Sequence, residues 1–494
     1  MKNAVLLLVA FGVVRPGTSA AASLTEGPRL AAVYDSILSA RFDQADAQLK
    51  HACPPAPEEA CLALSAVSVW WRILLDPASK RLDATLNVRA GAAIAATEAW
   101  TRREPRRAEA WFYLAGSYAP LVQWRVLRGE RLAAARDGNK IRAALERALA
   151  LDPTLDDAYF GIGLYHYYAD VAPAAAKILR WLLFLPGGDR MRGMREMLRA
   201  REHGQLLTGE ADYQLHVIYL WYEQKPAAAL ELLQRLDARY PTNLLFLQRI
   251  AEVERDYLHD HPASAAAWLQ LLDRARSGAI SDPPLAETVA RLGLARELDA
   301  MYETDRAVEH LKAIIAANPT APAGAGADAR VQLAAASERL GHDGYRLSLE
   351  GWRALERGDA RLAEAQLARA VARAPADPVA RYRHARALEA IGDRDRAREE
   401  LERVVTARLV PAIVLASALV DYAETIERTG DRARALGLYR DAARIVGGDP
   451  RARDQATRAI RRLTRRERSS RNFFDFFRTL CLTSVFSNRN LHLV

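Results

Sequence analysis

One pattern of small, large and proline residues recurs along this chain and restricts the folds that it can adopt. After Ala363, Leu367 follows at four residues, Ala370 at seven, and Pro375 comes five residues later. Spacings of three and four place the first three residues on one face of a helix, and proline cannot continue that helix. A second copy of the pattern begins at Ala397. The interval from Ala363 to Ala397 predicts helix pairs that repeat about every 34 residues.

Further stretches carry the same pattern in a compatible order. They are Trp111, Leu114, Ala115 and Tyr118; Ile141, Leu145, Ala148 and Pro153; Tyr159, Ile162 and Gly163; Ala229, Leu233, Leu236 and Pro241; Leu247, Ile250 and Ala251; Ala307, Leu311, Ile314 and Pro319; and Ala435, Tyr439 and Ala442. The small residues allow two helices to approach closely, and the large apolar residues fill the space between them. The interval from Ala397 to Ala435 is one helical turn longer than the interval from Ala363 to Ala397.

This order of residues resembles the tetratricopeptide repeat, a helix–turn–helix unit of about 34 residues. The resemblance implies an all-α fold, a tetratricopeptide-like α-solenoid of antiparallel helix pairs that forms a right-handed superhelix with a concave surface. It also implies a scaffold that binds a protein or peptide segment. The composition agrees with an all-α fold, because half of the residues are apolar and many of these are alanine.

The N-terminus has the features of a secretory signal peptide over residues 1–22. Lys2 supplies a positive charge, the apolar run 4–14 follows, and Ala20-x-Ala22 matches a signal-peptidase site. So short an apolar run cannot span a bilayer. We therefore expect an exported, periplasmic protein of a bacterial envelope. The alternative is an uncleaved signal anchor.

The remaining chain divides into two predicted arrays and a tail. Residues 23–318 form an N-terminal helical array with an irregular insertion at about 119–210, where the pattern departs from the family. The Pro/Gly/Ala-rich stretch 319–329 is the predicted linker, and residues 330–466 form the C-terminal array. Residues 467–494 contain no alanine but five of the 11 phenylalanines. We expect this tail to be disordered or weakly helical, and it is either a membrane- or partner-seeking segment or an artefactual end.

Cys53 and Cys61 flank PPAPEEA, a proline-rich connection between two helical patterns. In an oxidising compartment they are expected to form a disulfide. The alternative is two unpaired thiols.

The net charge of +9 does not indicate nucleic-acid binding. Residues 451–494 hold 11 Arg against three acidic residues, a net charge of +8, which leaves +1 for residues 1–450. A nucleic-acid partner is therefore not predicted, because the body of the chain is nearly neutral.

No motif for catalysis, cofactor binding or metal binding is present: the chain has no HExxH, no GxSxG and no phosphate-binding glycine loop. His259-Asp260-His261 fits a solvated turn, His166 a packed or groove residue, and Glu202-His203 a charged helix face. No enzyme is predicted. The alternative of an unrecognised enzyme would place its site within 119–210.

The resemblance also assigns ligand-facing positions on the first helix of each repeat. These positions are Phe112; Asp157, Phe160, Leu164, Tyr167 and Tyr168; and Tyr382 and Arg386. Aromatic anchors beside charged groups suit a peptide-binding groove, since they offer a large contact area at low entropy cost. Two alternatives remain open. Helices within 170–207 could bury the tyrosines in a core, or a membrane-associated module could contact lipid through ILRWLLFL (178–185) and the tail.

Overall fold

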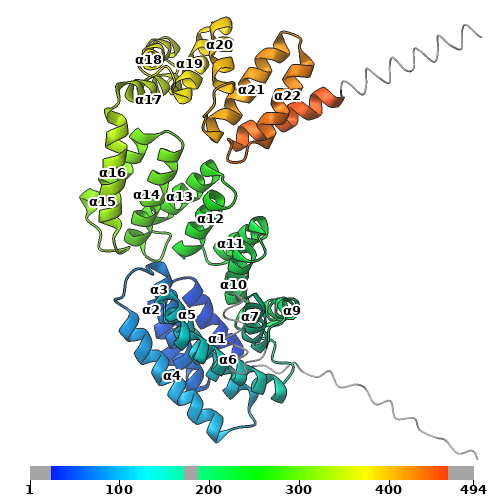
Figure 1. Ribbon diagram of the computed structural model, residues 1–494. Helices are drawn as coiled ribbons and strands as arrows, with labels where there is room; N and C mark the ends of the chain where they lie inside the picture. The colour runs from blue at the N-terminus through cyan, green and yellow to red at the C-terminus, as the bar shows by residue number, and fades with distance from the viewer. Residues whose placement is uncertain (1–23, 172–186, 466–494) are drawn as a thin grey trace, which may run out of the picture. The chain divides into compact units, whose positions relative to one another are not determined.

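The computed structural model describes residues 24–171 and 187–465. The predicted signal peptide, the stretch ILRWLLFL and the tail 467–494 lie outside the described residues. Within those two ranges every regular element is an α-helix and there is no strand (Figure 1). The predicted all-α fold of antiparallel helix pairs is therefore confirmed.

The chain forms two compact units. Unit 1 comprises residues up to 73 and 80–215, and unit 2 comprises 74–79 and the residues from 216 onward. The helices that begin in unit 1 are α1 (Gly27–Leu38), α2 (Phe42–Ala52), α3 (Glu58–Leu75), α4 (Asp83–Arg103), α5 (Ala108–Leu127), α6 (Arg131–Leu151), α7 (Ala158–Val171), α9 (Arg190–His203) and α10 (Thr208–Trp221). This division differs from the predicted one, which placed its boundary at 319–329.

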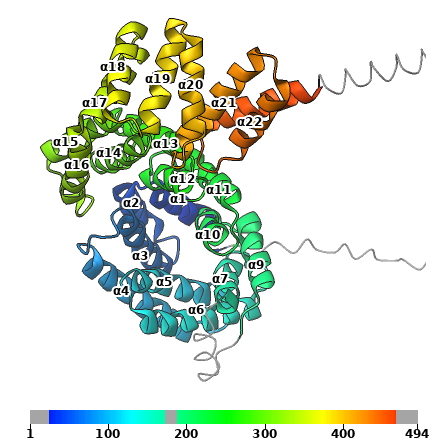
Figure 2. The same ribbon diagram turned by 45° about the horizontal axis from the view of Figure 1, so that its top comes forward.

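Unit 2 continues with further helices, most of them in consecutive pairs. They are α11 (Pro226–Arg239), α12 (Leu244–Asp256), α13 (His261–Arg276), α14 (Pro283–Ala300), α15 (Thr304–Ala317), α16 (Ala325–Gly341), α17 (Asp343–Glu356), α18 (Ala360–Arg373), α19 (Pro378–Ile391), α20 (Arg394–Val405), α21 (Ala412–Arg428) and α22 (Arg432–Arg444). The pairs α17–α18, α19–α20 and α21–α22 lie side by side in chain order (Figures 1 and 2). We call the first helix of each pair the A helix and the second the B helix.

A glycine followed by aspartate makes the turn between the A and B helices of these three pairs. Gly358, Gly392 and Gly430 have φ angles of 85°, 89° and 95°, which glycine adopts without steric cost. The next residues (Asp359, Asp393 and Asp431) each accept a hydrogen bond from a backbone N–H in the first turn of the B helix. The sequence thus ends one helix and starts the next at the same point of each repeat.

Small residues allow the two helices of a pair to touch, as the repeat pattern predicts. A Cβ atom added to Gly351 of α17 would lie 2.5 Å from Cγ of Leu367 in α18. In unit 1, a Cβ atom on Gly163 of α7 would lie 2.7 Å from the carbonyl oxygen of Gly193 in α9. Helix α9 is therefore the B helix that packs on α7.

The irregular region begins with two long helices. Helices α5 and α6 have 20 and 21 residues, against 14 in each of α17, α18 and α19. The insertion near residues 120–138 therefore lengthens both members of the pair. Arg128, at the end of α5, donates two hydrogen bonds of 2.8 Å to Asp83 at the start of α4, which fixes the extended hairpin to its neighbour.

Cys53 and Cys61 form a disulfide with a Cα–Cα distance of 6.3 Å. It joins the end of α2 to the first turn of α3.

The predicted linker is shorter than the sequence suggested. Helix α16 begins at Ala325 and so includes the last five residues of the stretch 319–329. Alanine is the best helix former, and Gly324, with a φ angle of 89°, turns the chain just before the helix. Only three of the 17 residues of α16 are buried, and one of them, Ala329, packs with residues of α14 and α15. Helix α16 therefore packs on the helices α14 and α15.

In the described ranges, none of the helices has the combination of length and apolar composition that crossing a membrane requires.

Candidate partner-binding face

The packing of each helix pair determines which side of the A helix is left for a partner. In α7, Gly163 packs against Gly193 and Met197 of α9, and the Tyr159 ring lies 3.9 Å below the guanidinium of Arg199. His166 also contacts α9, with its Nδ1 atom 2.6 Å from Glu196. The residue three positions before the small residue of the A helix is Phe112 in α5, Phe160 in α7 and Tyr382 in α19.

In unit 1, the structure buries most of the residues predicted to face a ligand. Phe160 is 7% exposed and Tyr167 is fully buried. Phe112 and Asp157 are also buried, whereas Leu164 and Tyr168 are half-buried. A side chain without exposed surface cannot anchor a partner on an open face. The buried four are therefore part of the core of unit 1, which corrects the prediction.

Asp157 shows why this part of the face is closed. Its carboxylate accepts hydrogen bonds from the backbone N–H groups of Gln205, Leu206 and Leu207 at 2.8, 3.0 and 2.8 Å. Burial raises the pKa of Asp157, while the three N–H donors act in the opposite direction. The residue thus anchors the segment between α9 and α10 to the start of α7.

The N-terminal part of the chain closes another side of unit 1. Glu109 of α5 accepts hydrogen bonds from the backbone N–H and the hydroxyl of Thr25, at 2.8 and 2.9 Å. Tyr34 of α1 and Trp71 of α3 both donate to one oxygen of buried Glu210, at 2.9 and 3.0 Å. This carboxylate therefore holds α1 beside α10 (Figure 2). Its pKa is raised by burial.

The A helices of the C-terminal repeats present a more open face. Tyr382 is half-buried and Arg386 is exposed. The Tyr382 hydroxyl and the Arg386 guanidinium both donate to Oδ2 of Asp421 in α21, each at 3.1 Å. Burial raises the pKa of Asp421 to about 6, although Arg386 acts to lower it. Tyr382 and Arg386, which the sequence predicted to share a face, therefore lie together. Asp421, the residue that binds both, was not identified by the repeat register.

Neighbouring positions extend this face over three A helices, α17, α19 and α21. Half-buried Trp352 of α17 lies one repeat length before Arg386, at the same position of the repeat. The Arg383 guanidinium lies 5.6 Å from the Trp352 ring and donates to the hydroxyl of Ser348 at 3.1 Å. Arg428 of α21 donates to Glu389 of α19 at 3.3 Å. The repeat spacing could have identified Trp352 from the sequence.

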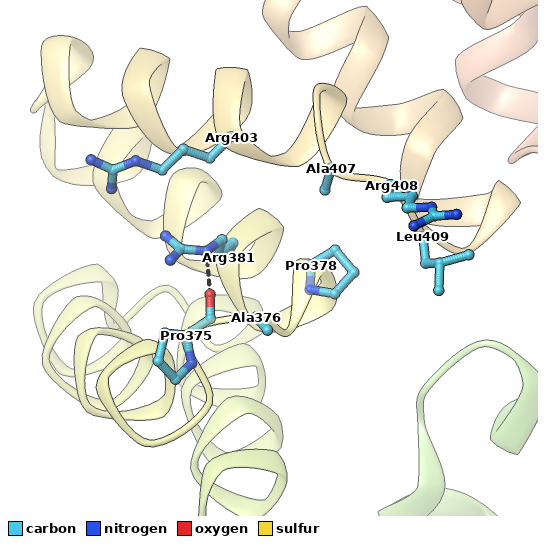
Figure 3. Close-up of a pocket in the computed structure, with 8 residues that line it drawn as sticks. All are labelled: Pro375, Ala376, Pro378, Arg381, Arg403, Ala407, Arg408 and Leu409. Carbon is cyan, nitrogen blue, oxygen red and sulfur yellow. Dashed lines mark hydrogen bonds between the residues drawn. The ribbon is translucent and has the colours of Figure 1, made fainter.

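A pocket of about 340 Å³ lies at the loops between the C-terminal repeats (Figure 3). Its lining residues are Pro375, Ala376, Pro378, Arg381, Arg403, Ala407, Arg408 and Leu409. Arg381 and Arg403 lie together on one side, and Arg408 and Leu409 lie on the other. The Nε atom of Arg381 donates to the carbonyl oxygen of Pro375 at 2.8 Å.

Two of the histidines that the sequence singled out, His261 and His166, contact carboxylates. Nδ1 of His261 lies 2.7 Å from Oε2 of buried Glu297, which raises the pKa of His261. Nδ1 of His166 lies 2.6 Å from Oε2 of Glu196. Across residues 24–171 and 187–465, no cluster of three His, Cys, Asp or Glu side chains has a geometry that could hold a metal ion.

The comparisons with known proteins bear on the C-terminal repeats. Residues 354–410 match the family model described as tetratricopeptide repeat. This part of the chain is therefore similar to tetratricopeptide repeats, in agreement with its helix pairs α17–α18 and α19–α20. No curated protein matches the chain in sequence.

Several solved structures are similar to this chain at low identity. The TPR2AB domain of yeast Sti1 in complex with pHSP90 is 14% identical, with 52% of this chain and 98% of that one covered and a TM-score of 0.23. The TPR domain of P58(IPK) is 12% identical, with 79% and 96% covered and a TM-score of 0.27. Yeast Tom70 is 12% identical, with 90% and 96% covered and a TM-score of 0.27.

Proposed function

We propose that this chain is an exported, non-enzymatic scaffold that binds a segment of another protein on the face formed by α17, α19 and α21. The observation that carries the proposal is the set of accessible aromatic and charged side chains on adjacent A helices. Trp352, Tyr382 and Arg386 are half-buried or exposed, and they belong to repeats of a family whose fold suits protein binding.

The chemistry of this face suits a peptide better than a small molecule. Trp352 and Tyr382 offer rigid apolar surface with a polar edge, and arginine and carboxylate groups surround them. Aromatic and arginine side chains are the residue types that dominate protein–protein binding energies. Hydrogen bonds between α19 and α21 hold these groups in place before a partner arrives, which reduces the entropy lost on binding.

A site-specific crosslinker tests the face directly. The full-length chain would carry a photoreactive phenylalanine analogue in place of Arg386, or in place of exposed Arg369 on the B helix α18 as a matched control. We expect one or a few proteins to crosslink from position 386 and to be displaced by excess unlabelled chain. They should not crosslink from position 369. Equal crosslinking from both positions would contradict the proposal that the partner binds the face formed by α17, α19 and α21.

Export is tested separately. The N-terminal sequence of the protein recovered from cells should begin at Ser23, with the chain in the periplasmic fraction, because Ala20-x-Ala22 precedes that bond. An uncleaved chain in the membrane fraction would support the signal anchor instead.

A further inference from the structure

The one repeat interval that is longer than its predecessor contains the segment beside the pocket. Ala435 follows Ala397 one helical turn later than the regular repeat would place it. In the structure, α20 ends at Val405, an irregular segment spans residues 406–411, and α21 then runs for 17 residues, against 14 in α19. The extra turn therefore lengthens α21, while the segment 406–411 connects α20 to α21. Ala407, Arg408 and Leu409, three of the residues that line the pocket, come from the segment 406–411.

The apolar part of the pocket is exposed to solvent. Leu409 has 83% of its surface exposed, the highest value among the exposed large hydrophobic residues of the described ranges. Pro378, Ala376 and Ala407 lie on the same lining, between Leu409 and the arginines (Figure 3). A leucine exposed on the connection between α20 and α21 offers surface to an aliphatic side chain.

The charged part of the pocket is unbalanced. Glu400 is buried and accepts from Arg381 at 2.7 Å and from Arg403 at 2.8 Å, so one carboxylate already serves two guanidinium groups. Glu399 lies 3.9 Å from Arg403. Arg408 is exposed and has no ion-pair partner among the described residues. A carboxylate brought by a ligand would complement this excess of positive charge.

We propose that this pocket binds an extended peptide segment in which an acidic residue stands next to an aliphatic one. The carboxylate pairs with Arg408, and the aliphatic side chain packs on Leu409 and Pro378. The carboxylate could come from a side chain or from a chain terminus, since both present the same oxygen atoms. The proposal rests on the proposed function, because it supplies a second contact for the same partner.

Fluorescence anisotropy with the full-length chain tests the pocket. The probe is a fluorescein-labelled octapeptide of alternating Glu and Leu with an amidated C-terminus, compared with the same peptide carrying Gln for Glu and with a Gln/Leu peptide that has a free C-terminus. We expect the Glu/Leu peptide to bind at least about fivefold more tightly than the amidated Gln/Leu peptide at low salt, since exposed charge pairs contribute modestly. If the Gln/Leu peptide with a free terminus binds as tightly, the terminal carboxylate is the source.

Two variants and two matched controls locate the binding. Arg408→Glu should weaken binding of the Glu/Leu peptide about tenfold and Leu409→Ser about threefold, because one adds repulsion and the other removes apolar contact. Arg394→Glu makes the same charge change at the opposite end of α20, and Leu362→Ser shortens an exposed leucine on α18. Both controls should change the affinity less than twofold.

If the variants and the controls had equal effects, or if all three peptides bound equally well, the proposal that this pocket binds the peptide would be wrong. That result leaves the α17–α19–α21 face untouched, because position 386 would still crosslink to a partner. Loss of that crosslink with retained binding at the pocket would overturn the proposed face and keep the pocket.

Discussion

Phe160 in unit 1 and Tyr382 in the C-terminal repeats occupy the same position of the repeat but have different surroundings. Each precedes the small residue of its A helix by three positions. Phe160 is buried, whereas Tyr382 keeps part of its surface accessible and bonds through its hydroxyl to Asp421. The repeat therefore determines the side of the helix on which a residue lies, and distant segments determine whether solvent reaches it.

The covering segments of unit 1 are identifiable. Asp157 holds the segment 205–207, and Glu109 holds Thr25. Both acidic residues stand at the same position of the repeat, six residues before the small residue of the A helix, Gly163 or Ala115. Unit 1 thus fills part of its A-helix face with its own chain, and the C-terminal repeats leave theirs accessible.

The largest expected difference between the two regions is in stability. Tyr167→Ala should destabilise unit 1 by about 3–5 kcal/mol, because it removes a fully buried aromatic ring from α7. Tyr382→Ala should cost less, since part of that side chain is already in water. Urea unfolding with hydrogen exchange of α7 and α19 measures both losses. Equal costs would mean that the two faces are equally closed.

The pH dependence of the C-terminal repeats comes next. The pKa of Asp421 is raised from 3.8 to about 6 by burial, so the folded chain keeps a proton that the unfolded chain has already released between those values. Stability should therefore fall as the pH rises through this window, by up to about 3 kcal/mol, and then remain level above pH 6. Arg386, Glu389 and Tyr382 face the same carboxyl group.

Asp421→Asn is the control for that titration. It should flatten the difference in stability between about pH 4 and pH 6, as measured by urea unfolding monitored through exchange in α21. The same slope in the variant and in the native chain would assign the titration to another group.

The disulfide is the third difference between the two regions, because it should affect the stability of unit 1 alone. Reduction of Cys53–Cys61 should lower the stability of α2 and α3 by about 2–3 kcal/mol in the chain-entropy model, because it releases a short closed loop. Thermal unfolding with and without reductant measures the loss, and α19 should keep its exchange rates. A Cys53→Ser/Cys61→Ser chain should not respond to reductant. A response of that chain equal to the native one would contradict the assignment.

The smallest expected effect tests which positions on the A helices of unit 1 are covered by other segments. Gly116 of α5 occupies the repeat position of Leu164 in α7, and a Cβ atom there would meet no other atom within 4 Å. Gly116→Ala should therefore stabilise the chain by about 0.4–1 kcal/mol, as should Gly437→Ala in α22, which also has open space. Thermal unfolding is sufficient for both. Destabilisation at Gly116 alone would show that the covering of unit 1 extends over this position.

The sequence predicted the helix pairs because their causes are local. The small residue at Gly163 or Gly351, the proline after the B helix and the Gly-Asp turns all act within one repeat. The cover over Asp157 and Glu109 depends on segments far along the chain, at 205–207 and at Thr25, which no periodicity reveals. Trp352 was accessible to sequence reasoning through the repeat spacing, whereas the pairing of Tyr382 and Arg386 with Asp421 was not, because the repeat containing Asp421 is one helical turn out of step.

The hydrogen bond between Tyr34 and Glu210 also has a consequence for how the protein is made. These residues are 176 positions apart. A ribosome that adds about 5–20 residues per second needs roughly 9–35 s to travel from one to the other. During that time the apolar side of α1, with Leu30 and Ile37, has no Glu210 to hold it against the rest of unit 1. Helix α1 can pack on α2 as soon as both have been made, but its link to α10 forms only after Glu210 has left the ribosome.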